Sequence, residues 1–359
     1  MKSFYVSESD LCALLKAWAG GYRLVAPKRE GPSVLFRPYA QDELPENAAA
    51  ALTERATLSA KEVMFPKSEV LLAYTASKNE ENRADLDQRI EDMSVAAVKP
   101  VVLFGLRPCD ARGFAVLDKP YLEGRFVDPY YKARREAAVI VTCLCTDALP
   151  TCFCTWVGGS PNSSEGSDVT FVPVQDGFLF TALTEKGLAL FDGASLREAD
   201  ADHDAQAQAA LKSAEASMPA SPFPAGLSES VAAAFTLDAF WEKETVKCLS
   251  CNACTYVCPT CQCFNITDEG SPLDGRRVRS WDSCMSPLFT LEASGYNPRA
   301  KKYQRMRNRI EHKFNYYPGD HEGMFSCVGC GRCVRSCPVS LDIRSVVLKA
   351  AEQGAAQKG

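Results

Sequence analysis

The chain has 359 residues, of which 46% are hydrophobic and 24% charged, and its formal net charge is −5. This composition is ordinary for a globular protein of about two domains, and the acidic balance argues against nucleic-acid binding, which needs a basic face. No apolar run reaches the roughly 18 residues of a membrane span. Its first residues, "MKSFYVSESD", lack an apolar secretory core. We therefore expect a cytoplasmic protein, where 17 cysteines indicate metal-bound thiolates rather than disulfides.

Residues 1–195 predict an α/β layered domain in which strands alternate with helices. A helix is expected over 7–21, where serine and aspartate precede apolar residues at helical spacing. A second helix is expected within 109–122, stopping at Pro120, and Asp176-Gly177 marks a hairpin over 171–183. Apolar runs rich in valine and leucine predict buried strands at 69–74, 99–106 and 137–145.

The composition changes at 196–228, which predicts a solvated helix followed by a proline-rich linker. Residues 229–349 are helical in composition and form the second expected domain, and 350–359 are expected to be a flexible tail. A basic segment at 297–314 with helical spacing faces either an acidic partner or solvent. The expected fold class is α+β: an N-terminal α/β domain followed by a mainly helical domain.

Two cysteine runs dominate the second domain: "CLSCNACTYVCP" at 248–259 and "CVGCGRCVRSCP" at 327–338. In two-cluster ferredoxins three cysteines of such a run bind one [4Fe–4S] cluster, and the fourth binds the other cluster. A zinc site needs only four ligands, usually in two pairs. The sequence therefore predicts a two-cluster ferredoxin-type domain with interlocked ligand sets. One set is Cys248, Cys251, Cys254 and Cys337, and the other is Cys327, Cys330, Cys333 and Cys258.

Four cysteines of the first domain are candidates for a third metal centre. Cys109 lies where a strand gives way to a helix, so that backbone N–H groups and the helix dipole can stabilise negative charge. Cys152 and Cys154 alternate on an extended segment and can face one metal, and Cys145 starts the preceding coil. The alternative is that the four act as small buried hydrophobes. Cys143 lies inside the apolar strand and is the weaker candidate.

The remaining features carry less information. Cys12 is expected to pack in the core, and Cys261, Cys263 and Cys284 either hold a further centre or pack beside the clusters. Arginines 107 and 112 flank Cys109 and could offset cluster charge or form surface salt bridges. Isolated histidines, here His203, His312 and His321, usually have surface or packing roles.

Several long motifs resemble one iron–sulfur family. They are "FGLRPCDARGFAVLD", "TCFCTWVGGSP", "CPTCQCFNITD", "RSWDSCMSPLFTLEASGYNPR" and "RIEHKFNYYPGDHEGMFSCVGCGRCVRSCPVSLDI". The family includes an iron–sulfur component of anaerobic sulfite reductase, the β component of sulfhydrogenase (NiFe hydrogenase) and flavin-oxidoreductase partners of heterodisulfide reductase. The resemblance covers about residues 60–160 and 240–345. It places the family's first-domain cysteines on Cys109, Cys145, Cys152 and Cys154, and so implies a third [4Fe–4S] cluster.

The same resemblance implies an electron-transfer component of an oxidoreductase complex in anaerobic metabolism. Its implied partners are a catalytic subunit of hydrogenase, sulfite reductase or heterodisulfide reductase type and a flavin or NAD(P)H-binding subunit. The chain carries no G-x-G-x-x-G fingerprint and no P-loop, and its few titratable groups near the cysteines argue against acid–base catalysis. Two other hypotheses are an iron–sulfur enzyme with a catalytic cluster in the first domain, and an iron–sulfur transcription sensor, which the acidic charge disfavours.

Overall fold

The computed structural model describes residues 2–40, 52, 54–93, 98–194 and 196–358. Within these residues, one sheet has the strand order β10-β1-β9-β8-β7-β6-β2-β3. Its strands are β1 (Lys2–Ser7), β2 (Arg23–Glu30), β3 (Ser33–Pro38), β6 (Val101–Leu106), β7 (Ala138–Cys143), β8 (Val169–Val174), β9 (Gly177–Ala182) and β10 (Arg197–Glu198). The strands from β2 through β6 and β7 to β8 run in parallel. Every residue of β6 and β7 is buried, as the apolar runs predict for strands covered on both faces.

Helices pack on both faces of this sheet. On one face, α1 (Glu8–Gly21) follows the N-cap Ser7, the first residue of the expected helix, and buries Leu11, Leu15 and Trp18. The other face is covered by α3 (Lys61–Met64), α4 (Pro108–Leu122) and α5 (Pro129–Ala137), which bury Phe114 and Tyr131. Burial of each such large apolar side chain contributes about 1.5–3 kcal/mol.

Helix α4 does not end at its proline, as the sequence had predicted, but continues through Pro120 to Leu122. A proline inside a helix leaves the carbonyl four residues earlier without its N–H donor. Here that carbonyl belongs to Val116, and the Tyr317 hydroxyl donates a hydrogen bond to it. The hydrogen bond that Pro120 cannot donate to Val116 is therefore replaced by one from Tyr317, about 200 residues further along the chain.

The hairpin predicted at Asp176-Gly177 joins β8 to β9, and Asp176 has the positive φ of 59° that such turns need. After the short helix α6 (Glu185–Leu188), helix α7 (Ala201–Ala216) follows in the segment expected to be solvated. One side of α7 is in fact buried: Ala207 and Leu211 pack against Val172 and Leu179 of the sheet. The predicted helix is therefore present and most of its residues are exposed, but the expectation that it is solvated misses one side, where His203, Ala207, Leu211 and Ala214 are buried.

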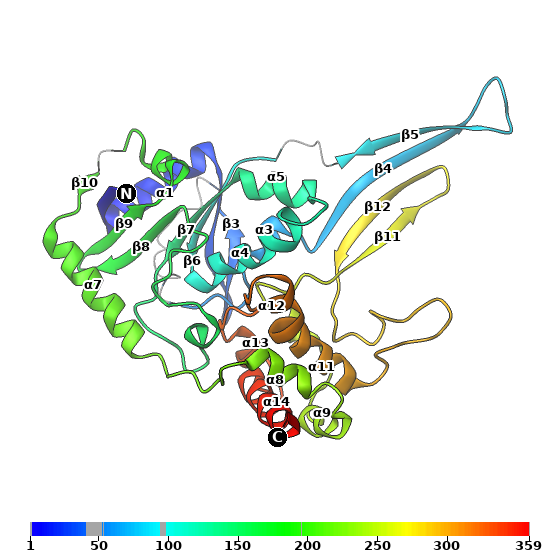
Figure 1. The fold of residues 1–359 in the computed structure, drawn as a ribbon. Helices are drawn as coiled ribbons and strands as arrows, with labels where there is room; N and C mark the ends of the chain where they lie inside the picture. Colours follow the sequence, from blue (N-terminus) through cyan, green and yellow to red (C-terminus); the bar gives the residue numbers. More distant parts are fainter. Residues whose placement is uncertain (1, 41–51, 53, 94–97, 195, 359) are drawn as a thin grey trace.

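A second sheet joins the two halves of the chain and projects from the body of the molecule (Figure 1). Its order is β11-β12-β4-β5, with β4 (Ser68–Lys78), β5 (Leu86–Asp92), β11 (Phe264–Gly270) and β12 (Asp274–Trp281). The apolar run at 69–74 lies in β4, but most of its side chains are only partly buried. The expectation of a buried strand is corrected here, because β4 lies in the projecting sheet.

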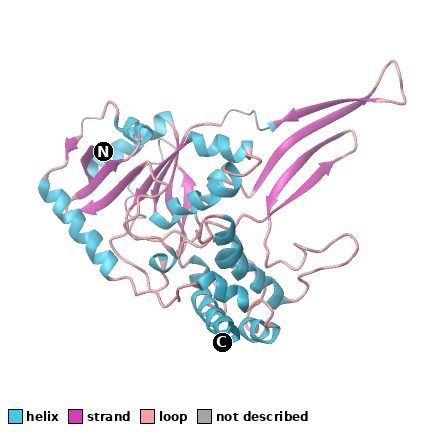
Figure 2. Cartoon of the chain, in the orientation of Figure 1, coloured by secondary structure: helices cyan, strands magenta, loops and turns pink. Residues whose placement is uncertain are grey.

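The rest of the second half is helical and gathers at one end of the molecule (Figure 2). Its helices are α8 (Leu227–Ala233), α9 (Asp238–Thr245), α10 (Ala253–Tyr256), α11 (Lys302–Glu311), α12 (Tyr317–Asp320), α13 (Arg332–Arg335) and α14 (Ile343–Lys358). Trp241, Phe314 and Val347 are fully buried in its core. Helix α14 continues through the expected tail, apart from residue 359, which lies outside the described residues; buried Ala350 and Ala351 hold it in this core. Across the described ranges, no helix combines the length and apolarity needed to cross a membrane.

Candidate metal centres

Three cavities are each lined by one of the predicted sets of four cysteines. We name them the first-domain cavity (Cys109, Cys145, Cys152 and Cys154), the middle cavity (Cys258, Cys327, Cys330 and Cys333) and the far cavity (Cys248, Cys251, Cys254 and Cys337). Cys330 also lines the first-domain cavity, and Cys333 also lines the far cavity. The three cavities therefore follow one another in a row. The assignment of these thiols as cluster ligands remains a prediction.

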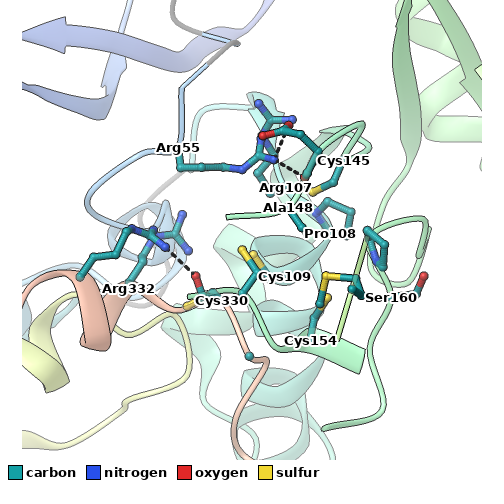
Figure 3. A pocket seen from close by; sticks show the side chains of 16 residues that line it. Arg55, Arg107, Pro108, Cys109, Cys145, Ala148, Cys154, Ser160, Cys330 and Arg332 are labelled. Carbon is teal, nitrogen blue, oxygen red and sulfur yellow. Dashed lines mark hydrogen bonds and ion pairs between the residues drawn. The ribbon is translucent and has the colours of Figure 1, made fainter. Parts of the chain in front are cut away.

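The first-domain cavity lies at the carboxyl edge of the parallel strands. Figure 3 shows Cys109, Cys145 and Cys154 around it. Strand β6 leads into α4, where Cys109 is the second residue, and the paired strand β7 leads to Cys145. Parallel strands bring their carboxyl ends to one edge, which is where open α/β sheets place their sites. Cys152 and Cys154 arrive on the following loop and 3-10 turn. Cys143, in contrast, stays inside β7 and is buried in the core.

Burial controls the protonation of these thiols. It raises the pKa of Cys145 to about 11 and that of Cys154 to about 12, and together with the neighbouring Asp110 it raises the pKa of Cys109 well above its usual value. Thiols with such pKa values are protonated at neutral pH, whereas metal ligands are thiolates. Metal binding at this cavity must therefore release protons.

Four arginines line the first-domain cavity, and each already has a protein partner. Arg55 pairs with Asp147 at 2.8 Å, and Arg107 donates to the Cys143 sulfur at 3.3 Å. Arg332 pairs with Asp110, and Arg335 donates to the Thr151 hydroxyl. The two arginines that flank Cys109 in the sequence have different positions. Arg107 lines the cavity, whereas Arg112 lies outside it, donates a hydrogen bond to the Val157 carbonyl and pairs with Glu165. Both arginine side chains are buried, although the Glu165 carboxylate that pairs with Arg112 is exposed.

The second cysteine run packs directly against the first domain. The Phe153 backbone N–H donates to the Gly329 carbonyl at 2.8 Å. A Cβ added to Gly329 would lie 2.5 Å from backbone atoms of Cys154, and one added to Gly331 would lie 2.4 Å from the Thr151 carbonyl oxygen. Both glycines also have positive φ, at 63° and 69°. The close approach of two backbones thus explains the glycines that the sequence placed beside the ligands.

The first run has the same local conformation with different residues. Ser250 and Asn252 occupy the corresponding positions and have φ values of 55° and 64°. Each run then enters a four-residue helix, α10 or α13. Asparagine adopts positive φ more readily than most other non-glycine residues. The second run needs glycine at these positions because its backbone contacts residues 151–154. The repeat seen in sequence is therefore also a repeat of backbone geometry.

Substitution of Gly331 by alanine tests this contact. We expect Gly331→Ala to destabilise the chain by about 2–4 kcal/mol, since backbone strain and overpacking add. Gly323→Ala is the matched control: Gly323 has a φ of 83° but no other atom within 4 Å of an added Cβ, so only strain remains. Anaerobic thermal unfolding measures both, and equal losses for the two variants would contradict the backbone contact.

The middle cavity contains a buried lysine. The Lys313 ammonium donates to the Cys258 sulfur at 3.5 Å, the Thr260 hydroxyl at 3.0 Å and the Ser326 carbonyl at 2.8 Å. A hydrogen bond from the Cys261 thiol, followed by the charge of Lys313, lowers the pKa of Cys258 well below its usual value. Cys258 is thus the thiol of this cavity most readily converted to thiolate, although it comes from the other run.

The far cavity combines three cysteines of the first run with Cys337. Backbone N–H groups of Ser250 and Leu341 donate to the sulfurs of Cys248 and Cys337, at 3.4 and 3.2 Å. Such N–H donors to sulfur tune the potential of iron–sulfur centres. Cys251 is exposed, so this end of the row of cavities reaches the surface.

Arg309 lies between the middle and far cavities and lines both. It is 4% exposed, and its Nε and Nη2 have no hydrogen-bond partner among the described residues. A buried unpaired cation is strongly unfavourable unless an anion accompanies it. Thiolates around an iron–sulfur cluster supply that negative charge, so the residues present fit the group that the cysteine spacing implies. Sequence reasoning missed Arg309, because its pattern is that of an ordinary basic helix.

The other candidate residues lie outside the three cavities. Cys12 is on α1, and Cys261, Cys263 and Cys284 lie beside the cysteine runs. His203 stacks on Tyr5 with ring centroids 4.1 Å apart. His312 and His321 contact Tyr317, and burial lowers the pKa of His312 to about 4.

Comparison with known proteins agrees with this architecture. A family model described as a 4Fe-4S dicluster domain matches residues 247–341. The β subunit of sulfhydrogenase 2 from Pyrococcus furiosus is 36% identical over 254 residues, which cover 67% of this chain and 71% of that relative. No solved structure matches the chain significantly. With a dicluster domain in the second half and a relative that spans both halves, the chain belongs to the sulfhydrogenase β-subunit family of iron–sulfur proteins.

Proposed function

We propose that this chain relays electrons through three [4Fe–4S] clusters, one at each four-cysteine cavity. The proposed ligands are Cys109, Cys145, Cys152 and Cys154; Cys258, Cys327, Cys330 and Cys333; and Cys248, Cys251, Cys254 and Cys337. The observation that carries the proposal is the row of cavities linked through Cys330 and Cys333. When bound, such clusters supply one-electron redox chemistry with potentials set by burial and hydrogen bonds.

The relay connects two partner subunits in this proposal. One end is the exposed Cys251, and the other is the first-domain cavity, whose lining includes the exposed Asp147. One partner is linked to flavin or NAD(P)H and the other is a catalytic redox subunit, which the resemblance to the family implies. The chain itself positions the clusters and balances their negative charge with the cations of Arg309, Lys313 and Arg332. In this role it needs no substrate site of its own.

The iron content of anaerobically prepared protein tests the number of centres. We expect about 12 iron atoms per chain, and about 8 after Cys152→Ala, because one cubane cluster loses a ligand. Cys12→Ala is the control, since this cysteine lies on α1 away from the cavities and its loss should leave iron unchanged. A wild-type iron content near 8 atoms per chain that Cys152→Ala leaves unaltered would contradict the proposed first-domain cluster. Zinc in place of iron would contradict all three clusters.

An iron–sulfur enzyme with a catalytic first-domain cluster is the other interpretation of this site. The partners of the cavity arginines count against it in part: Arg107, Arg332 and Arg335 are held by protein groups, whereas the buried Nη1 of Arg55 has no hydrogen-bond partner among the described residues. Viologen-linked turnover of a small sulfur or carbon substrate by the purified chain alone would favour the enzyme and count against a pure relay.

A further inference from the structure

The outer strand of the projecting sheet, β5, has a neighbouring strand on one side only. The sheet order is β11-β12-β4-β5, so β5 pairs with β4 alone among the described strands. All seven of its residues are exposed, and the sheet extends away from the body of the molecule (Figure 1). The backbone N–H and C=O groups along its free edge can therefore pair with a strand of another chain.

Proteins usually protect such an edge, and β5 lacks most of that protection. Lysine, proline and β-bulges all discourage pairing at an edge strand. The strand reads LDQRIED, without lysine or proline, and its register with β4 is continuous along its whole length. It also exposes two large apolar side chains, Leu86 at 47% and Ile90 at 64%. Its charged residues are of mixed sign, so their effect on pairing depends on which charges meet.

The alternation of side chains along β5 sorts them onto two faces of the sheet. Leu86, Gln88 and Ile90 lie on one face, and Asp87 and Arg89 lie on the other. One face of this edge is therefore apolar at both ends, and the other carries one acidic and one basic side chain.

We propose that two copies of this chain associate by antiparallel pairing of β5 with β5, with Gln88 of one copy opposite Gln88 of the other. A two-fold axis perpendicular to the sheet makes this pairing symmetric. Leu86 of each copy then lies opposite Ile90 of the other copy, and Asp87 of each lies opposite Arg89 of the other. The pairing makes two apolar contacts on one face and two ion pairs on the opposite face, and it joins the two projecting sheets into one.

Charge complementarity selects this register. Arg89 has no ion pair or side-chain hydrogen bond within the described ranges, so its charge is available to a second copy. A register centred on Arg89 would place Asp87 opposite Glu91, and like charges directly opposite each other are unfavourable. A register centred on Ile90 would pair Arg89 with Glu91, but it would place Leu86 opposite a position beyond the end of the strand. Only the register centred on Gln88 matches both the apolar and the charged residues.

The other edge strand, β11, offers no such match. Its charged residues are Asp268 and Glu269, which already pair with Arg277 and Arg276 of β12 at 2.8 and 3.1 Å. The strand contains no basic residue, so two copies that met at β11 would form no ion pair between their edge strands. The projecting sheet therefore has one self-complementary edge, and it is β5.

Sedimentation velocity of the anaerobic holoprotein over a concentration series tests the proposal. We expect a reversible equilibrium between monomer and dimer, since one strand edge is small compared with the interface of a permanent dimer. Arg89→Asp and Asp87→Arg should each weaken dimerisation about tenfold or more, because like charges then meet twice in the dimer. The double variant Asp87→Arg with Arg89→Asp should recover most of the affinity, since it rebuilds both ion pairs with their signs exchanged.

The apolar contacts have a matched control on the opposite edge. Ile90→Lys should abolish the dimer, whereas Ile266→Lys, which places the same charge at a 46% exposed isoleucine of β11, should leave it unchanged. Far-UV circular dichroism and an iron content equal to that of the wild type confirm that each variant is folded. A chain that stays monomeric at every concentration, a dimer that survives Ile90→Lys, or a double variant as weak as the single ones would overturn the proposal.

Discussion

Replacing Arg332 by methionine should destabilise the chain by about 3–5 kcal/mol, because it leaves a buried carboxylate without its partner. Arg332 and Asp110 pair at 2.8 Å with side chains that are 3% and 1% exposed. The Arg332 Nε also donates to the Ala56 carbonyl. Asp110 in turn caps α4, the helix that carries Cys109. One ion pair thus ties the second cysteine run to the first-domain cavity, and anaerobic thermal unfolding measures its loss.

The control for this substitution lies three residues further along. Arg335→Met removes an exposed arginine that donates to Thr151, so we expect a loss of about 1 kcal/mol or less. The double variant Asp110→Asn with Arg332→Met should recover part of the stability, because it removes the second charge as well. If Arg332→Met and Arg335→Met cost the same, or if the double variant loses the full sum, the buried pair is not what joins the two halves.

The grouping of the cysteines around three cavities was predictable because local spacing encodes it, while their role as cluster ligands stays a prediction. Three cysteines at intervals of three residues must lie within one coil, and the repeat supplies the fourth thiol from the other run. The position of Cys109 and Cys145 at one cavity was predictable for a related reason. Each residue follows a buried parallel strand, and adjacent parallel strands end at the same edge of the sheet. In both cases, neighbouring residues determine the geometry.

The contacts between the two halves of the chain were not predictable in this way. Arg332 lies 222 residues from Asp110, and β12 pairs with β4 from about 200 residues away. Nothing in the sequence near either partner identifies the other. The apolar run of β4 consequently looked like a core strand, although its neighbours are hairpin strands of a projecting sheet. Arg309 was missed for the same reason, since only the fold places it between two cavities.

Replacing Arg309 by methionine should lower the reduction potentials of the middle and far centres. A reduced cluster carries one more negative charge than an oxidised one, and a nearby cation stabilises the reduced form. A unit charge at about 4 Å and an effective dielectric constant of about 20 contributes about 4 kcal/mol, which corresponds to a shift of about 170 mV for a one-electron couple. Methionine keeps much of the side-chain length while removing the charge. Potentiometric titration followed by EPR measures the shift for each centre.

Arg307→Met, on the same helix, is the matched control for this shift. The Arg307 guanidinium points away from the cavities and bonds Asp238 and the Phe235 carbonyl, so its loss should leave the potentials nearly unchanged. In the iron-free chain the same substitution should raise the free energy of unfolding. Without an anionic cluster, Arg309 is a buried cation with unpaired N–H groups, so Arg309→Met should stabilise the apoprotein relative to the wild type. Equal potentials in both variants, or a destabilised apoprotein, would show that Arg309 is not held in place to balance cluster charge.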